Sequence, residues 1–199
     1  MSIFISAGHS NKDPGAVNGT YTEAKIVRDM RNMVAYYLRE AKVDFRTDGV
    51  GLTNLPLKEA GRMAATADVA VEFHCNSFHL PTAQGVEALA GVKDKELSKK
   101  LCSAVSKHMN NTIRGGDGGW KSEGSGQHSR LFFVQKGGII LELFFISNPK
   151  ELARWEEVKW LVAREVAEVL IEAVGGKLPA PVQVVRVCPC CKQTIKEVK

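Results

Sequence analysis

The chain has 199 residues, of which 44% are hydrophobic and 25% charged, with 18 glycines and 7 prolines. These values are typical of soluble globular proteins and exclude a collagen, a coiled coil and a disordered chain. A chain of this length can bury one core without disulfides, so we expect a single domain. No apolar run approaches the roughly 20 residues that span a bilayer, and the opening residues lack the pattern of a signal peptide. We therefore expect a protein made in the cytosol without membrane insertion.

The net charge of +5 is concentrated at the carboxyl end of the chain. Residues 177–199 contain five basic residues and one acid, so they account for +4 and leave +1 for residues 1–176. A near-neutral body without a basic stripe or interleaved aromatic residues argues against a nucleic-acid-binding module. The sequence therefore predicts a domain over residues 1–176 and a basic tail over residues 177–199, with a stiff Pro179-Ala180-Pro181 linker between them.

Three of the five cysteines lie in the tail, within Cys188-Pro189-Cys190-Cys191. Their Cys-x-x-Cys spacing is similar to one knuckle of a zinc ribbon, but the second pair that would complete a four-ligand site is missing. Either a second chain completes this half-site, or the tail is a disordered basic appendage that is attracted to anionic envelope lipid or wall polymer. We favour the appendage.

Strands and helices alternate along the body. An apolar, β-branched run predicts a strand at residues 2–7, and apolar residues at intervals of three and four predict a helix at 22–41. The same patterns predict further strands at 43–46, 69–73, 85–90 and 138–146, and further helices at 57–66, 94–110 and 152–174. Six glycines between residues 114 and 129 predict a functional loop without regular structure. This alternation indicates an α/β sheet with helices on both faces.

Three reactive side chains are expected at one edge of that sheet. His9 comes two residues after the first predicted strand, His74 comes one residue after the strand at 69–73, and Glu142 lies in the last strand. Two histidines at one edge favour a metal site, since neutral imidazole is the commonest side-chain ligand of zinc. Glu142 stands alone among apolar residues, where a carboxylate is costly to bury unless it is paired or used for acid/base chemistry.

Two further carboxylates compete for roles at this site. Glu23 stands three residues after Thr20, so it could form a capping box at the start of the helix, or it could reach back to the histidines. Two histidines with one carboxylate make a catalytic zinc set, so we favour Glu23 as the third ligand. Glu72 shares the strand face of His74, and ranks second as a ligand or as a partner that orients a ligand.

Short motifs follow one another in an order that resembles a known family. They are Ser6-Ala7-Gly8-His9, Asp13-Pro14-Gly15-Ala16, Glu23, Phe73-His74-Cys75-Asn76, Gly85-Val86-Glu87, and Ile140-Leu141-Glu142 with Phe145-Ile146-Ser147-Asn148. From residue 3 to about 175 the chain is similar to the zinc-dependent N-acetylmuramoyl-L-alanine amidases of the amidase_3 type, which hydrolyse peptidoglycan. The resemblance implies a mixed, mostly parallel sheet, Zn²⁺ held by His9, Glu23 and His74, and Glu142 as the catalytic carboxylate.

The resemblance also implies a substrate and a setting. We expect cleavage of the amide bond between N-acetylmuramic acid and L-alanine, with Asn76, Trp120 and His128 as candidate substrate-binding residues. A chain that is made in a host cytoplasm and then released to the cell wall would act as a bacteriophage lysis enzyme. The alternative within enzymes is a zinc peptidase that cuts inside the stem peptide, which the metal set alone does not exclude. The sequence gives no indication of the oligomeric state.

Overall fold

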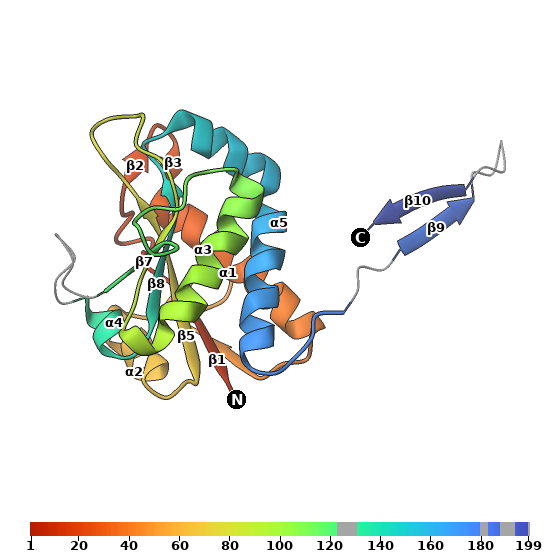
Figure 1. The fold of residues 1–199 in the computed structure, drawn as a ribbon, viewed down its shortest axis with the longest axis horizontal. Coiled ribbons are helices and arrows are strands. Elements are labelled where there is room, and N and C mark those ends of the chain that lie inside the picture. Colours follow the sequence, from red (N-terminus) through yellow and green to blue (C-terminus); the bar gives the residue numbers. More distant parts are fainter. Residues whose placement is uncertain (123–130, 180–182, 188–193, 199) are drawn as a thin grey trace.

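The computed structural model describes residues 1–122, 131–179, 183–187 and 194–198. Within them a six-stranded sheet has the order β4-β1-β5-β8-β6-β7 (Figure 1). The strands are β1 (Ile3–Ala7), β2 (Val17–Asn18), β3 (Tyr21–Thr22), β4 (Phe45–Thr47), β5 (Val69–Asn76), β6 (Glu87–Leu89), β7 (Trp120–Lys121), β8 (Ile139–Phe145), β9 (Gln183–Val187) and β10 (Thr194–Val198). The helices are α1 (Glu23–Glu40), α2 (Leu57–Ala64), α3 (Lys95–Met109), α4 (Phe132–Gln135) and α5 (Pro149–Ala173), with a 3₁₀ turn at Val92–Asp94.

The sheet is mixed and mostly parallel, as predicted. Strands β4, β1, β5 and β8 run parallel, whereas β6 pairs antiparallel with β8 and parallel with β7. Because β6 runs in the opposite direction, it begins at the edge where β5 and β8 end. Its first residue, Glu87, is therefore opposite Glu142 of β8, which in turn is opposite His74 of β5.

The two faces of the sheet are covered unequally. Helices α1, α3 and α5 pack the large core on one face, and Figure 1 shows α3 and α5 side by side there. Helices α2 and α4 cover part of the other face, where Phe4, Ala70 and Ile140 contact them in a smaller cluster. Ser6, Glu72 and Glu142 each lie two residues after one of these three apolar residues. Because residues two apart on a strand share a face, their side chains lie on this second face, beyond its apolar part. The polar part of the face is where the predicted site residues lie.

Several element boundaries differ from the prediction. β5 continues to Asn76, so His74 lies inside the strand and not after it. α5 begins at Pro149 because Asn148 caps it, its side chain accepting hydrogen bonds from the N–H groups of Lys150 and Glu151. The glycine-rich segment contains β7, which pairs with β6, so part of it is regular structure. The short helix α4 and the β2–β3 pair were not predicted.

The carboxyl end of the body also differs from the prediction. Leu178 is only 7% exposed and packs on the large core, so the body extends past the predicted boundary at residue 176. In the tail, β9 and β10 pair antiparallel, whereas we expected a disordered appendage. The cysteines of Cys188-Pro189-Cys190-Cys191 lie outside the described residues.

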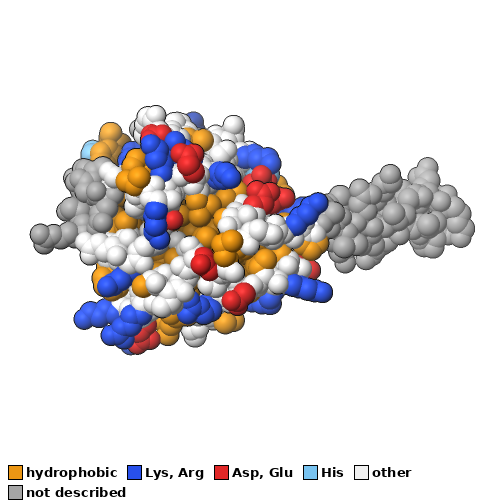
Figure 2. Space-filling model, turned by 60° about the horizontal axis from the view of Figure 1, so that its bottom comes forward, with side chains coloured by type: hydrophobic (Ala, Val, Ile, Leu, Met, Phe, Trp, Pro, Cys, Tyr) orange, Lys and Arg blue, Asp and Glu red, His pale blue; other side chains and the backbone are white. Residues whose placement is uncertain are grey.

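The surface agrees with the near-neutral charge of the body. On the face that Figure 2 presents, basic and acidic side chains are interspersed among hydrophobic ones. None of the helices in the described part of the chain combines the length and the apolar character needed to cross a bilayer.

Candidate active site

His9, Glu23 and His74 come together at the edge of the sheet. One donor atom from each of the three lies within 4.8 Å of the other two. Oε1 of Glu23 is the shared centre, at 3.2 Å from Nε2 of His9 and 3.1 Å from Nδ1 of His74. The two imidazole rings are nearly perpendicular, with their centroids 5.1 Å apart. Three donor atoms that converge in this way could hold one metal ion. We refer to His9, Glu23 and His74 as the donor set.

The local backbone explains how Glu23 reaches the histidines. The N-cap of α1 is Thr22, whose side chain accepts a hydrogen bond from the N–H of Lys25, so the capping box considered for Thr20 does not form. Glu23 is the first residue of the helix, and its carboxylate turns inward. Oε2 accepts a hydrogen bond from the N–H of Ala16 and Oε1 accepts one from the N–H of Cys75. Both bonds fix the carboxylate between β5 and the loop of residues 8–16, which we call the His9 loop.

Two glycines leave the space that these side chains need. A Cβ atom on Gly8 would collide with the His74 ring. Gly15 has φ +64°, and a Cβ atom there would lie 2.6 Å from Oε2 of Glu23 and 2.8 Å from the His9 ring. The Gly8-His9 and Asp13-Pro14-Gly15 motifs are therefore needed to bring the donor atoms together, beyond making a turn.

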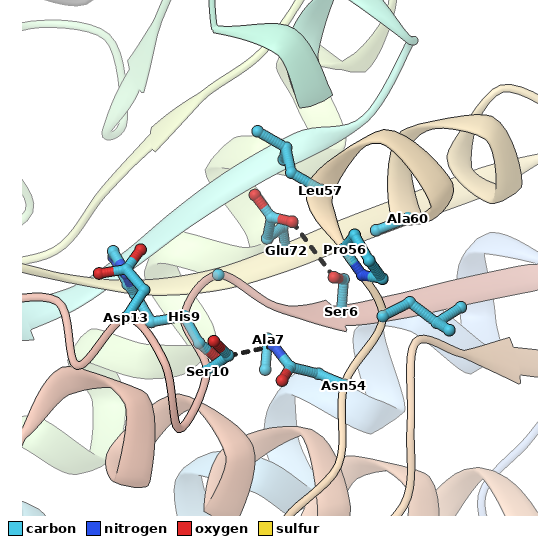
Figure 3. A pocket seen from close by; sticks show the side chains of 12 residues that line it. Ser6, Ala7, His9, Ser10, Asp13, Asn54, Pro56, Leu57, Ala60 and Glu72 are labelled. Atoms are coloured by element: carbon cyan, nitrogen blue, oxygen red, sulfur yellow. Dashed lines mark hydrogen bonds and ion pairs between the residues drawn. The ribbon is translucent and has the colours of Figure 1, made fainter.

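A second carboxylate contacts the remaining nitrogen of each histidine. Nδ1 of His9 lies 3.1 Å from Asp13, and Nε2 of His74 lies 3.1 Å from Glu72. Figure 3 shows Glu72 of β5 directed toward Ser6 of β1, whose hydroxyl donates a hydrogen bond of 3.2 Å to it. Metal-binding histidines are commonly oriented by such carboxylates, which accept the other ring N–H. The donor set therefore fits a metal ion, and the contact of Glu72 with His74 is compatible with an orienting partner. The contact between Asp13 and His9 was not predicted, although their spacing of four residues was visible in the sequence.

Contacts within this cluster shift the pKa values of its members. Burial acts to raise the pKa of Glu23, but hydrogen bonds with His74 and His9 hold it well below its usual range. Burial likewise acts to lower the pKa values of both histidines, yet their contacts with Glu23 raise them on balance. Each histidine must lose its proton before it can bind a metal, so protons and metal compete for this site.

Glu142 lies beside the donor set, in the middle of the sheet. It is 9% exposed and pairs in register with His74. Burial raises the pKa of Glu142 to about 7, and the negative charges of Glu23 and Glu87 add to this effect. Its Oε2 atom is buried and has no hydrogen-bond partner among the described residues. A carboxyl group with a pKa near 7 and a free oxygen can both accept and donate a proton at neutral pH.

A second buried carboxylate on the far side of Glu142 was not predicted as a functional residue. Glu87 is 2% exposed, and its Oε2 atom lies 2.6 Å from Nε of Arg114 and 2.7 Å from Nζ of Lys121. Asn76, a predicted substrate-binding residue, donates a hydrogen bond of 3.2 Å to its Oε1 atom. The signal that identified Glu142, a lone acid in an apolar strand, was present for Glu87 also.

Of the other two predicted substrate-binding residues, Trp120 is not brought to the donor set. Trp120 lies on the edge strand β7, where its indole N–H donates to the carbonyl of Ala90 and its ring faces the ammonium group of Lys95. These contacts are part of the packing around α3. His128 lies outside the described residues.

A cavity of about 120 Å³ borders the donor set on the side opposite Glu87. It lies between the His9 loop, residues 54–57 and α2, and Glu72 and Ser6 line its inner end (Figure 3). The side chain of Asn54 donates a hydrogen bond of 2.8 Å to the carbonyl of His9, so the wall of the cavity is attached to a donor residue.

Comparison with known proteins identifies the family. The family model of N-acetylmuramoyl-L-alanine amidases matches residues 3–172. A structure from Neisseria meningitidis, described as a candidate N-acetylmuramoyl-L-alanine amidase, is 44% identical with a TM-score of 0.84, covering 89% of this chain and 98% of that chain. The catalytic domain of CwlV, an amidase of Bacillus (Paenibacillus) polymyxa var. colistinus, has the same fold at 23% identity, with a TM-score of 0.72, and covers 88% of this chain and 99% of its own.

YqiI of Bacillus subtilis (strain 168) is 28% identical over 154 residues, which is 75% of this chain and 72% of that protein. The chain belongs to the N-acetylmuramoyl-L-alanine amidase family.

Proposed function

We propose that the chain hydrolyses the amide bond between the lactyl group of N-acetylmuramic acid and L-alanine in peptidoglycan, using zinc held by His9, Glu23 and His74. The observation that carries this proposal is the convergence of three donor atoms within 4.8 Å, with Glu142 in register beside His74. Family membership supports the choice of bond. Two nitrogens and one carboxylate oxygen leave room for a further ligand, which is typical of catalytic zinc sites.

Zinc, when bound, would polarise the scissile carbonyl and lower the pKa of the attacking water. The residues of the chain perform the proton transfers. Glu142 accepts a proton from the attacking water and then donates it to the alanine nitrogen as the amide bond breaks. Asp13 and Glu72 hold the two imidazole rings in the orientation in which one nitrogen of each faces Glu23.

Analysis of digested peptidoglycan separates this proposal from a peptidase that cuts inside the stem peptide. The zinc-loaded protein is incubated with purified sacculi, and the soluble products are identified by mass spectrometry and amino-terminal labelling. An amidase releases intact stem peptides with a new L-alanine amino terminus and leaves the glycan strands whole. A new amino terminus at any other stem residue would show that the chain is a peptidase.

A role in cell lysis as a bacteriophage enzyme stays a prediction, and the three relatives described above come from bacteria. It is tested by expressing the chain in a bacterial host and opening the inner membrane with a pore-forming protein. Rapid lysis that depends on Glu142 would support the role.

A further inference from the structure

We propose that Arg114 and Lys121 form a subsite for the free α-carboxylate of the second residue of the stem peptide. The inference rests on the proposed function and adds a substrate preference to it. In peptidoglycan, L-alanine is followed by a D-glutamyl residue whose chain continues through its side-chain carboxyl. The α-carboxyl of that residue is a free acid in some walls and a carboxamide in others.

The position of the general acid sets the direction in which the substrate lies. Glu142 must reach the alanine nitrogen to protonate it, so the peptide leaves on the Glu142 side of the donor set. The muramyl side then faces the cavity beside His9 and Glu72. The next strand beyond Glu142 is β6, and its Glu87 stands directly opposite Glu142. The stem peptide therefore passes over Glu87 and its two cationic partners.

The spacing agrees with the structure of the peptide. Neighbouring strands lie about 4.8 Å apart. Arg114 and Lys121, which contact Glu87 on the neighbouring strand, therefore lie somewhat farther than this from Glu142. In an extended peptide the α-carbon of the second residue is roughly 5 Å from the nitrogen of the first, and its carboxylate projects beyond it. A carboxylate at that position reaches the cations without distortion of the chain.

The charges also favour an anion at this point. One buried carboxylate against two cations leaves a net charge of +1. The side chains of Arg114 and Lys121 are 36% and 27% exposed, so both are accessible from solvent. Arg114 uses Nε for Glu87 and Nη1 for the carbonyl of Gln84, and its Nη2 group makes no hydrogen bond within the described part of the chain. Arg114 also lines an open cavity of about 480 Å³ between residues 82–84 and 112–115.

The test compares two muramyl peptides that differ only in this group, one with the free α-carboxyl and one with the carboxamide. Initial rates of L-alanine amino-terminus formation by the zinc-loaded full chain give kcat/KM for each. We expect the wild-type protein to prefer the acid form by about 10-fold, as for a hydrogen bond between charged partners. In Lys121→Met and Arg114→Met the ratio falls toward one, whereas Lys121→Arg restores it.

Lys107→Met is the matched control, because Lys107 makes an ion pair of the same length, 2.7 Å, with Glu165 between α3 and α5. It should keep the wild-type ratio. Equal rates on both forms by the wild-type protein would overturn the subsite. An equal loss on both forms in the variants would also overturn it, because the cations would then serve only to hold Glu87. If the wild-type protein cleaves neither form at the alanine amide, the proposed function itself fails.

Discussion

Glu142, the proposed catalytic carboxylate, is the single acid in the buried strand β8. Its neighbours in β8 are apolar and fully packed, and its side chain faces the part of the sheet that α2 and α4 leave uncovered. Burial raises the pKa of Glu142 to about 7, a value suited to a group that takes and returns a proton. The same burial makes its ionised form costly in the folded protein.

Glu142→Gln should keep the fold and the bound metal but reduce kcat by about 10²- to 10⁴-fold. The amide has nearly the same shape but cannot accept a proton from water. Turnover on peptidoglycan and zinc content per chain are measured together. Glu59→Gln, at an exposed carboxylate on α2, serves as the control. Wild-type turnover in the Glu142 variant would make the residue structural.

The raised pKa of Glu142 also predicts a pH dependence of stability. Its pKa is about 7 in the folded state, against an ordinary value of 4.5 for a glutamate exposed to water. Well below pH 4.5 the carboxyl is protonated in both states and has no effect on stability. Between pH 4.5 and 7 the unfolded state ionises first, so folding loses stability, and above pH 7 the loss is complete, on the order of 3 kcal/mol. Metal-free Glu142→Gln should therefore be more stable than metal-free wild type at pH 8. At about pH 3, well below both pKa values, this difference should disappear, and an equal difference at both pH values would contradict this origin.

Among single residues, the sequence drew attention to unusual residue types at particular positions. It missed residues whose place in the site depends on a contact with a distant segment of the chain. His9 and His74 stood out as histidines after predicted strands, Glu142 as a lone acid inside one, and Glu23 as an acid at the start of the following helix. The link between Glu87, Arg114 and Lys121 joins residues on β6, on β7 and in the loop before it. No local pattern reports such a contact, because it exists only after β6 has paired with β7.

Two buried arginines make α1 the element that holds the wall of the site. Arg31 and Asp48 form an ion pair of 3.0 Å with both side chains fully buried. Arg31 also donates to the carbonyls of Gly51 and Thr53, and Arg28 donates to the carbonyl of Leu52. The loop that contains Asn54 is thus fixed to α1, and through Asn54 to the carbonyl of His9.

Arg31→Met should lower the free energy of unfolding by about 3–5 kcal/mol, because it leaves Asp48 buried without its partner. Denaturant unfolding of the metal-free protein measures this loss. Lys58→Met, at an exposed residue of α2, should change stability by less than about 0.5 kcal/mol. A loss in Arg31→Met no larger than in the control would show that the ion pair does not stabilise the loop.

The order and type of the main elements followed from hydrophobic periodicity, whereas their ends did not. α5 begins earlier than predicted because the cap at Asn148 overrides the apolar pattern. β6 was expected as a strand, but its direction was not predicted. It runs antiparallel to β8 because the segment between β5 and β6 contains no helix that would carry the chain back across the sheet.

For the molecule as a whole, the basic tail is predicted to assist attachment to the cell envelope. A chain that ends after Pro179 keeps Leu178 in the core and should retain hydrolysis of soluble muramyl peptides. It should bind whole envelopes more weakly than the full chain at low salt. The difference should shrink as salt rises, because exposed charges are screened over about 10 Å at 0.1 M. Envelope sedimentation at several salt concentrations measures this, and a difference that does not change with salt would exclude an electrostatic role.

The central claim is that a metal held by His9, Glu23 and His74 enables hydrolysis of the muramyl-L-alanine bond. The most direct measurement is the rate at which new L-alanine amino termini form in purified peptidoglycan while zinc is added back to metal-depleted protein. We predict a rate that rises to a plateau at one zinc per chain in the wild type and stays at background in His74→Ala. Full activity without metal, or a wild-type response in His74→Ala, would contradict the claim.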